Sequence, residues 1–292
     1  MKKIPVAIFF LIVAGAAAYT QRTSIKEAIS DWQKPDVEEV AYSAIAPETD
    51  DTIPVEVEPT DEPDLVVAPV TESEDQPVAV PATEDPTMIE PEETTPPTTS
   101  NTTLPAEFNL AVPFTSQAPK SIWDEVHEET CEEASSLMAA YYYDGASGKI
   151  DPDTAEAALL KIVAFENSYF GYYKDTTASQ TANLIEAYFH LTSDVLQDPT
   201  VDDIKTALVA GHPVIVPAAG RQLGNPNFTG EGPLYHMFVV KGYTKTGFIV
   251  NDPGTRLGAD YFYTFDVVMN AMHDWNDGDV ANGAKVIIVV KP

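Results

Sequence analysis

A stretch of 71 residues, 35–105, contains no Lys, Arg or Gly, but it carries 19 acidic residues and 13 of the chain's 24 prolines. Such a segment buries too little apolar surface to offset the conformational entropy that folding removes. We therefore expect a disordered acidic linker rich in Pro and Thr. In a chain of 292 residues, this leaves residues 106–292 as one domain, which is long enough to form its own core.

The N-terminus has the pattern of an export signal. Two lysines precede an uncharged and mostly apolar run, residues 4–18, which ends in three alanines. This pattern predicts a signal peptide or a signal anchor over residues 1–21. The run is shorter than the ~20 residues that cross a bilayer, which favours cleavage. The long linker behind it favours an anchor formed by residues 4–19, because a spacer is useful when its N-terminal end is held in place.

Residues 22–105 would separate this signal from the domain. A short helix is predicted over residues 23–34, and the disordered linker follows it. An extended polyproline chain rises ~3.1 Å per residue, so the linker could reach on the order of 220 Å. We expect the domain to function outside the cytoplasm, either secreted or held at a distance from the cell surface.

Charge and cysteine content exclude several classes of function. The formal net charge of −30 at pH 7 divides into +3 for residues 1–34, −19 for 35–105 and −14 for 106–292. Without clustered Lys and Arg, the domain is not expected to bind nucleic acid, and membrane contact is expected only through the N-terminal segment. The single Cys excludes an intramolecular disulfide and a Cys-based zinc site. Because no metal or nucleotide motif occurs, we expect no cofactor and no metal.

Within the domain, helical patterns precede strand patterns. Apolar spacing and capping residues predict helices over residues 131–143, 151–167, 179–189 and 201–210, and a helical stretch over 266–275. Apolar runs predict strands over residues 109–114, 213–218, 236–243, 247–251, 261–265 and 285–290. Two of these strands, 236–243 and 247–251, are close enough to form a hairpin. This order predicts an α+β fold, with N-terminal helices packed on an antiparallel sheet.

Three residues in this pattern indicate nucleophilic catalysis. Cys131 begins a predicted helix, where the helix dipole and free N–H groups favour a thiolate. His236 lies at the start of one hairpin strand and Asp252 directly after the other, so the hairpin brings an imidazole and a carboxylate together. A thiol that attacks, an imidazole that takes its proton and a carboxylate that orients the imidazole form a catalytic triad. Asn251 is a second candidate for the group that orients the imidazole. Neighbouring residues on a strand point to opposite faces, so only one of Asn251 and Asp252 can have this role.

The same residues carry a resemblance to a known family. The segments VPFTSQAP, WDEVHEETCEEASSLMAAYYY and GPLYHMFVVKGYTKTGFIVNDPG occur in this order. They resemble the C39-like cysteine peptidases, which have a papain-like fold, over about residues 109–292. The resemblance implies that Cys131 is the nucleophile, His236 the general base and Asp252 the acid that orients it. It also implies that Gln117, with the backbone N–H of Cys131, holds the oxyanion.

The surroundings of Cys131 depart from the family pattern. Thr130 stands where Gly is common, and Glu132-Glu133 follow the nucleophile, while Glu128-Glu129 lie just before it. Nearby negative charge raises the pKa of a thiol and opposes the helix dipole. Glutamate in the first turn of a helix is also an ordinary stabilising choice. A further hypothesis is that these four carboxylates make the cleft prefer a cationic peptide segment.

The remaining histidines have no chemical partner in the sequence pattern. We expect His127 to be an exposed loop residue, and His212 and His273 to be structural. His190 is expected at the end of a helix, where a cation suits the dipole.

These observations predict an exported, surface-tethered cysteine peptidase that cleaves peptide bonds through a Cys131 thioester. Its expected partner is a peptide or protein substrate, and a cell-wall peptide is one candidate. Two alternatives stay open. One is an amidase or transpeptidase that acts on cell-wall peptides with the same fold. The other is a catalytically silent peptide-binding module on a tether.

Overall fold

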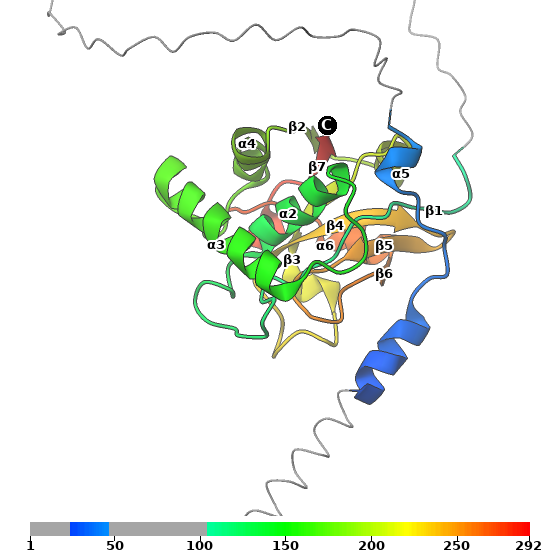
Figure 1. Ribbon diagram of the computed structural model, residues 1–292, viewed down its shortest axis with the longest axis horizontal. Helices are drawn as coiled ribbons and strands as arrows, with labels where there is room; N and C mark the ends of the chain where they lie inside the picture. The colour runs from blue at the N-terminus through cyan, green and yellow to red at the C-terminus, as the bar shows by residue number, and fades with distance from the viewer. Residues whose placement is uncertain (1–23, 47–103) are drawn as a thin grey trace, which may run out of the picture. The chain divides into compact units, whose positions relative to one another are not determined.

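Seven antiparallel strands form one sheet at the centre of the part of the chain that the structure describes (Figure 1). The computed structural model describes residues 24–46 and 104–292. The predicted signal segment and residues 47–103 of the predicted linker lie outside the described residues. Six strands follow the spatial order β2-β7-β3-β4-β5-β6, and β1 pairs with β4. The strands are β1 Phe108–Asn109, β2 Thr192–Gln197, β3 Val214–Ala219, β4 Tyr235–Tyr243, β5 Gly247–Asn251, β6 Tyr261–Thr264 and β7 Val286–Lys291.

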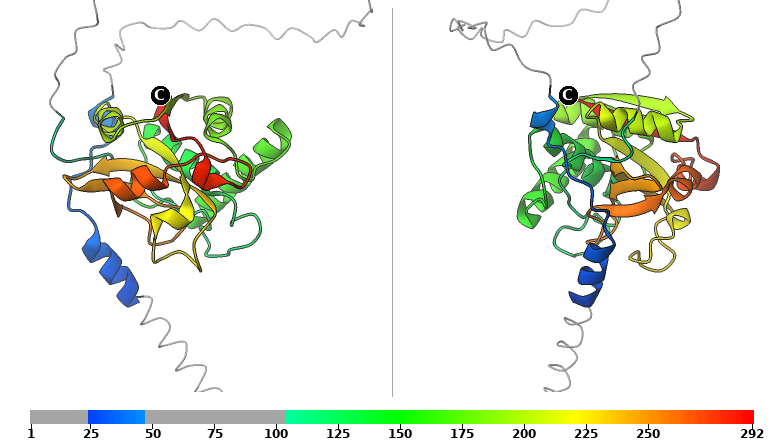
Figure 2. Two further views of the ribbon diagram at one scale, coloured as in Figure 1. Left: turned by 180° about the vertical axis from the view of Figure 1, so that it is seen from behind. Right: turned by 90° about the vertical axis from the view of Figure 1, so that its right-hand side faces the viewer.

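Helices cover both faces of this sheet. Figures 1 and 2 show α2 and α3 on one face and α6 on the opposite face. The helices are α2 Cys131–Tyr143, α3 Pro152–Tyr169, α4 Ala178–Phe189, α5 Val201–Val209 and α6 Phe265–Ala271, with short 3-10 turns η1 Tyr42–Ala44, η2 Gly220–Leu223 and η3 Val280–Asn282. Residues 24–33 are also helical. No helix within residues 24–46 and 104–292 has the length and apolar character needed to cross a membrane.

The sequence patterns predicted most of these elements. The mixed helix and antiparallel-sheet architecture is confirmed, and the helix predicted over residues 131–143 has the observed bounds of α2. Strand β2 was not predicted. Its sequence, TSDVLQ, is polar and only partly buried, and it pairs with β7 at one end of the sheet. The strand predicted over residues 109–114 is reduced to β1 and isolated bridges, because its chain leaves the sheet to enter the site described below.

Helix α2 lies in the middle of the core. Eleven of its thirteen residues are buried, so other parts of the protein pack around the whole circumference of the helix. The apolar side of its first turns faces β4 and β3, and the other side packs against α3 and α4 through Leu137, Leu159 and Leu184. The N-terminus of α2, which carries Cys131, is therefore held in a constant position relative to the sheet.

Residues 35–46, which composition assigns to the linker, instead pack against the domain. The N–H of Val40 donates to the carbonyl of Asn109, and the N–H of Ala111 donates to the carbonyl of Val40. The ring of Tyr42 stacks edge-on against Tyr142 and Tyr143. The structure differs from the prediction here because these residues include apolar side chains, such as Tyr42 and Ile45, which pack against the core of the domain.

This packing changes the role that the linker can have. Residues 24–46 and 104–292 belong to one compact unit. Both ends of the segment 47–103 are therefore attached to the same unit, and its extended length does not separate the N-terminal segment from the domain. The expectation of a spacer that holds the domain far from its N-terminal segment is wrong.

A buried cation links the N-terminal segment to the sheet. Lys241, in β4, is 1% exposed, and its ammonium group pairs with Glu39 and with Asp260, the latter at 2.6 Å. A buried charge is tolerated when it is paired and hydrogen-bonded. Glu39 is thus one of two groups that neutralise Lys241.

Replacing Glu39 should destabilise the protein. In the Glu39→Gln variant the ammonium of Lys241 stays buried with one carboxylate instead of two, and we expect the free energy of unfolding to fall by ~1–3 kcal/mol. Chemical denaturation of the full chain measures this loss. The neighbouring exposed residue provides the control, since Glu38→Gln should leave stability unchanged. Equal stability of the two variants would mean that the carboxylate of Glu39 contributes nothing to the fold.

Candidate active site

A buried histidine–aspartate pair lies where β4 begins and β5 ends. The two strands are antiparallel neighbours, with Val239 opposite Asn251, so Asp252 emerges beside the start of β4. Nε2 of His236 lies 2.8 Å from Oδ1 of Asp252, and the two side chains are 1% and 0% exposed. This contact occupies Nε2 and leaves Nδ1 as the nitrogen that can exchange a proton with another group.

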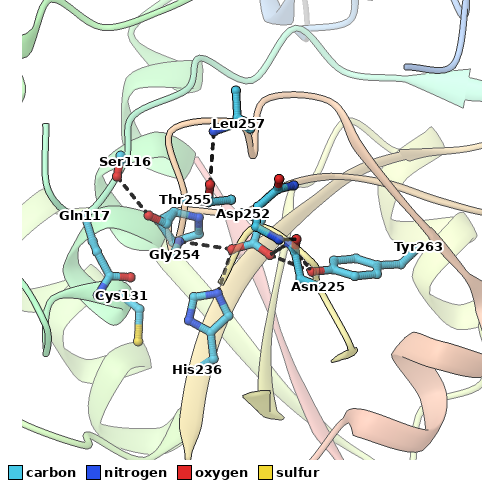
Figure 3. Close-up of polar contacts among 12 residues, drawn as sticks. Ser116, Gln117, Cys131, Asn225, His236, Asp252, Gly254, Thr255, Leu257 and Tyr263 are labelled. Atoms are coloured by element: carbon cyan, nitrogen blue, oxygen red, sulfur yellow. Dashed lines mark hydrogen bonds and ion pairs between the residues drawn. The ribbon is translucent and has the colours of Figure 1, made fainter. Parts of the chain in front are cut away.

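Three further donors hold the carboxylate of Asp252 (Figure 3). The hydroxyl of Tyr263 donates to Oδ2 at 2.7 Å, and the side-chain amide of Asn225 donates to the same atom at 3.1 Å. The backbone N–H of Gly254 donates to Oδ1 at 3.0 Å. Burial alone would raise the pKa of Asp252, but the charge and hydrogen bond of His236 and the other donors hold that pKa below its usual value. The group is therefore an anion that orients the imidazole.

Cys131 lies at the first position of α2, on the side of the imidazole away from Asp252 (Figure 3). Its thiol is 6% exposed and donates a hydrogen bond to Oε2 of Glu132 at 3.0 Å. Burial raises the pKa of the thiol well above its ordinary value, and the charge of Glu132 adds to this, whereas the backbone N–H of Met237 lowers it. In this state the thiol is protonated and points to Glu132.

A loop before α2 connects Gln117 to the aspartate. The N–H of Gln117 donates to the carbonyl of Pro253 at 2.9 Å, and the hydroxyl of Ser116 donates to the same carbonyl at 3.1 Å. Oγ1 of Thr130 donates to the carbonyl of Gln117. These contacts place the Ser-Gln pair of the sequence next to the Asp-Pro pair, although 135 residues separate them.

The side-chain amide of Gln117 is already engaged. Its Nε2 donates to the carbonyls of His127 at 2.9 Å and Glu128 at 3.2 Å. An amide nitrogen has two protons, so both are used in this state. For Gln117 to stabilise an oxyanion, one of the two carbonyls must give up its hydrogen bond.

Two glycines allow the turn after Asp252 to close tightly. A Cβ on Gly254 would lie 2.9 Å from Cε1 of His236 and 2.8 Å from the ring of Phe228. A Cβ on Gly258 would lie 1.8 Å from the carbonyl oxygen of Asp252, whose N–H donates to the carbonyl of Gly258. Any side chain at either position would displace the histidine or the aspartate.

Comparison with known proteins identifies the family. Residues 109–277 match the Peptidase_C39 like family, which covers more than half of the chain and contains Gln117, Cys131, His236 and Asp252. The chain belongs to this family. Among solved structures, a Bacillus anthracis protein assigned as a C39-like peptidase matches with 17% identity and a TM-score of 0.42, over 64% of this chain and 98% of that one. The comparison with curated protein sequences found no match.

These four residues come together from distant parts of the chain (Figure 3). Asn251 does not share this position. Its side-chain amide donates to the carbonyls of Val112 and Pro113, and its Oδ1 accepts the N–H of Asp260. As strand alternation requires, Asn251 and Asp252 point to opposite sides, and Asn251 fastens the chain before the Ser-Gln loop.

The expectation for His127 is wrong. The residue is 4% exposed, and its Nδ1 lies 2.7 Å from Oδ1 of Asp124 while Nε2 lies 3.3 Å from Oε2 of Glu156. Its carbonyl receives the amide of Gln117. His127 thus shapes the loop beside Cys131. Of the other histidines, His212 approaches the hydroxyl of Tyr143 at 3.2 Å, and His273 approaches the carbonyl of Gly283 at 2.9 Å.

The glutamates after Cys131 also differ from expectation. Glu132 and Glu133 are 1% and 0% exposed, so they are not solvated residues of a first helical turn, and they cannot meet a cationic substrate at the surface. Glu133 interacts electrostatically with Glu166 of α3, which is also fully buried, and none of their four carboxyl oxygens has a hydrogen-bond partner within the described chain. Buried carboxyls that act on each other and have no cation or donor beside them favour their neutral, protonated forms.

Burial shifts both carboxyls of this pair. Desolvation raises the pKa of Glu166 to about 7 and raises that of Glu133 well above its ordinary value, to which Glu166 contributes. Because the folded protein holds protons on this pair that the unfolded chain releases above about pH 4.5, the contribution of the pair to stability is greatest in acid. It is lost as the pH rises through the folded-state pKa values.

Replacing Glu166 by an amide should remove part of this dependence. We expect Glu166→Gln to raise the free energy of unfolding at pH 8 by ~1–3 kcal/mol and to change it little at pH 5, since the amide needs no proton. Guanidinium denaturation at the two pH values measures the difference. The exposed Glu107→Gln variant is the control and should follow the wild type. An unchanged pH dependence in Glu166→Gln would show that the pair is not protonated in the folded state.

Proposed function

We propose that the protein is an exported cysteine peptidase of papain-like fold that cleaves peptide bonds with Cys131, His236 and Asp252. The observation that carries the proposal is the buried His236–Asp252 pair, whose imidazole lies between the aspartate and the thiol at the start of α2. Membership of the Peptidase_C39 like family supports the same reaction class.

The geometry suggests an order of proton transfers. Nδ1 of His236 takes the proton of the Cys131 thiol, and the resulting thiolate attacks the carbonyl carbon of the substrate peptide. The imidazolium is stabilised by the anionic Asp252 and then gives its proton to the leaving amine. A water molecule, deprotonated by the same histidine, hydrolyses the thioester and restores the thiol.

The tetrahedral intermediates need donors for the oxyanion. The N–H of Cys131, at the positive end of α2, is one candidate, and the side-chain amide of Gln117 is the other. Since Nε2 of Gln117 holds the carbonyls of His127 and Glu128, substrate would have to displace one of these contacts.

Export is part of the proposal and is supported by the signal pattern in residues 1–21. Residues 37–46 pack against the domain that holds the catalytic residues. Glu27, in the helix before them, also pairs with Arg256 of the domain. An anchor formed by residues 4–19 would therefore keep the domain close to the membrane. The substrate of such an enzyme would be a peptide or protein segment near the cell surface.

Loss of either member of the Cys–His pair should abolish cleavage. We expect Cys131→Ala and His236→Ala to lower kcat/KM for a cleavable peptide by at least ~10³-fold, because no nucleophile or base remains. Cleavage of a fluorogenic peptide library by the full-length protein supplies the substrate and the rates. The exposed His190→Ala variant is the matched control and should retain activity.

The alternatives give different results in the same assay. An acyl transferase would form amine adducts when an amine acceptor is added, with Cys131 still required. A protein that neither cleaves peptides nor forms adducts, and whose Cys131 reacts with electrophiles as an ordinary thiol, would not be an enzyme of this type.

Removing the amide of Gln117 should slow the chemical step. We expect Gln117→Ala to lower kcat and kcat/KM together by ~10²-fold or more, which is the effect of losing one oxyanion donor. Steady-state kinetics with the selected peptide measure kcat and KM separately. A rise in KM at constant kcat would instead assign Gln117 to the shape of the loop that contains residues 127 and 128.

A further inference from the structure

Glu132 is fixed in contact with the nucleophile. Its Oε2 accepts the thiol of Cys131 at 3.0 Å, and its Oε1 accepts the backbone N–H of Thr176 at 3.1 Å. The carbonyl of Thr176 in turn accepts the hydroxyl of Tyr235, which precedes His236 in β4. The carboxyl is therefore buried, held from two sides and unable to move away from the sulfur without breaking these contacts.

This contact limits which charges the site can hold. If His236 removed the thiol proton while Glu132 was ionised, a thiolate and a carboxylate would face each other at 3.0 Å without solvent. Two acidic groups this close do not both ionise; they keep one proton between them. A thiolate can form beside Glu132 when the carboxyl carries that proton and donates it in a hydrogen bond to the sulfur.

The other charged groups around Glu132 favour its neutral form. Glu133 lies on the same helix, Glu166 on α3 and Asp175 on the loop before α4, and all three are acidic. From β4, Tyr235 adds no positive charge, and His236 becomes cationic when it has taken the thiol proton. Burial, together with the charges of Glu166 and Asp175, raises the pKa of Glu132 to about 8, against the hydrogen bond from the Cys131 thiol, which lowers it.

We propose that Glu132 works in its protonated form, as a hydrogen-bond donor to the Cys131 thiolate, so that the site is competent while Glu132 is neutral and loses competence when it ionises. The inference rests on the proposed function of Cys131 and His236. Before reaction the thiol and the carboxyl each hold one proton. The thiol proton moves to Nδ1 of His236, the carboxyl O–H turns to the sulfur, and Glu132 keeps its proton through acylation and hydrolysis.

Alkylation of the full-length protein by iodoacetamide tests this inference, because Cys131 is the only Cys in the chain. In the wild type we expect the rate to decline as the pH rises above about 8. In Glu132→Gln the amide can still accept the N–H of Thr176 and can donate to the sulfur at every pH. The decline should therefore disappear, and at pH 9 the variant should react ~10-fold or more faster than the wild type.

Two variants separate this effect from a general loss of charge. Glu128→Gln removes an exposed carboxylate three residues before Cys131, and it should reproduce the wild-type profile. Glu132→Ala removes the donor as well as the charge, and near pH 7 it should react more slowly than Glu132→Gln. A wild-type rate that rises steadily from pH 5 to 10 would overturn the inference without any variant, and so would equal rates of wild type and Glu132→Gln at pH 9.

The His236→Ala variant distinguishes this inference from the proposed function. If the Cys–His pair exists, His236→Ala should lose the reactivity that the wild type shows near pH 7. If His236→Ala and the wild type react alike, the proposed function fails, whereas the comparison of Glu132→Gln with the wild type at pH 9 still decides whether Glu132 controls the thiol.

Discussion

The desolvated carboxylate of Asp252 is the group on which the rest of the site depends. It is fully buried, and its negative charge is tolerated because four donors from different parts of the chain converge on it: His236 from β4, Tyr263 from β6, Asn225 from the segment after η2 and the N–H of Gly254. Each of these groups must be in place for the charge to be satisfied; two of them lie in strands of the sheet and two in the loops beside it. The orientation of the imidazole therefore depends on the relative positions of β4, β6 and two loops.

On the other side of Cys131 the structure has the opposite problem, since three buried acidic groups there form no ion pair with a cation among residues 24–46 and 104–292. Glu132 contacts the thiol, while Glu133, in the first turn of α2, interacts electrostatically with Glu166 of α3. Burial raises the pKa of all three carboxyls, so protons take the place of positive charges. Cys131, the proposed nucleophile, thus lies between the His236–Asp252 pair, which can accept its proton, and the carboxyls of Glu132, Glu133 and Glu166, which retain their own protons. The balance between the two decides when a thiolate can exist.

The N-terminal segment belongs to the same physical system. Lys241, in the strand that carries His236, is neutralised by Asp260 and by Glu39 from residues 24–46. The backbone of Val40 hydrogen-bonds to Asn109 and Ala111, in the segment that begins at β1. This segment continues into the loop of Ser116 and Gln117. Residues that precede the acidic linker therefore help to support the elements on both sides of the candidate active site, and the linker joins two parts of one folded unit.

Local patterns in the sequence determined the order of helices and strands, the start of α2 at Cys131 and the hairpin that pairs His236 with Asp252, because periodicity, capping and turn length act over a few residues. Tertiary structure alone decided the burial of Glu132, Glu133 and His127, the anchoring role of Asn251 and the return of residues 35–46 to the domain. A glutamate in a first helical turn has the same local pattern whether it faces water or a second carboxyl. Only the position of α3 and of the loop at Thr176 makes the difference, since the pKa of a carboxyl depends on the groups that surround it in space.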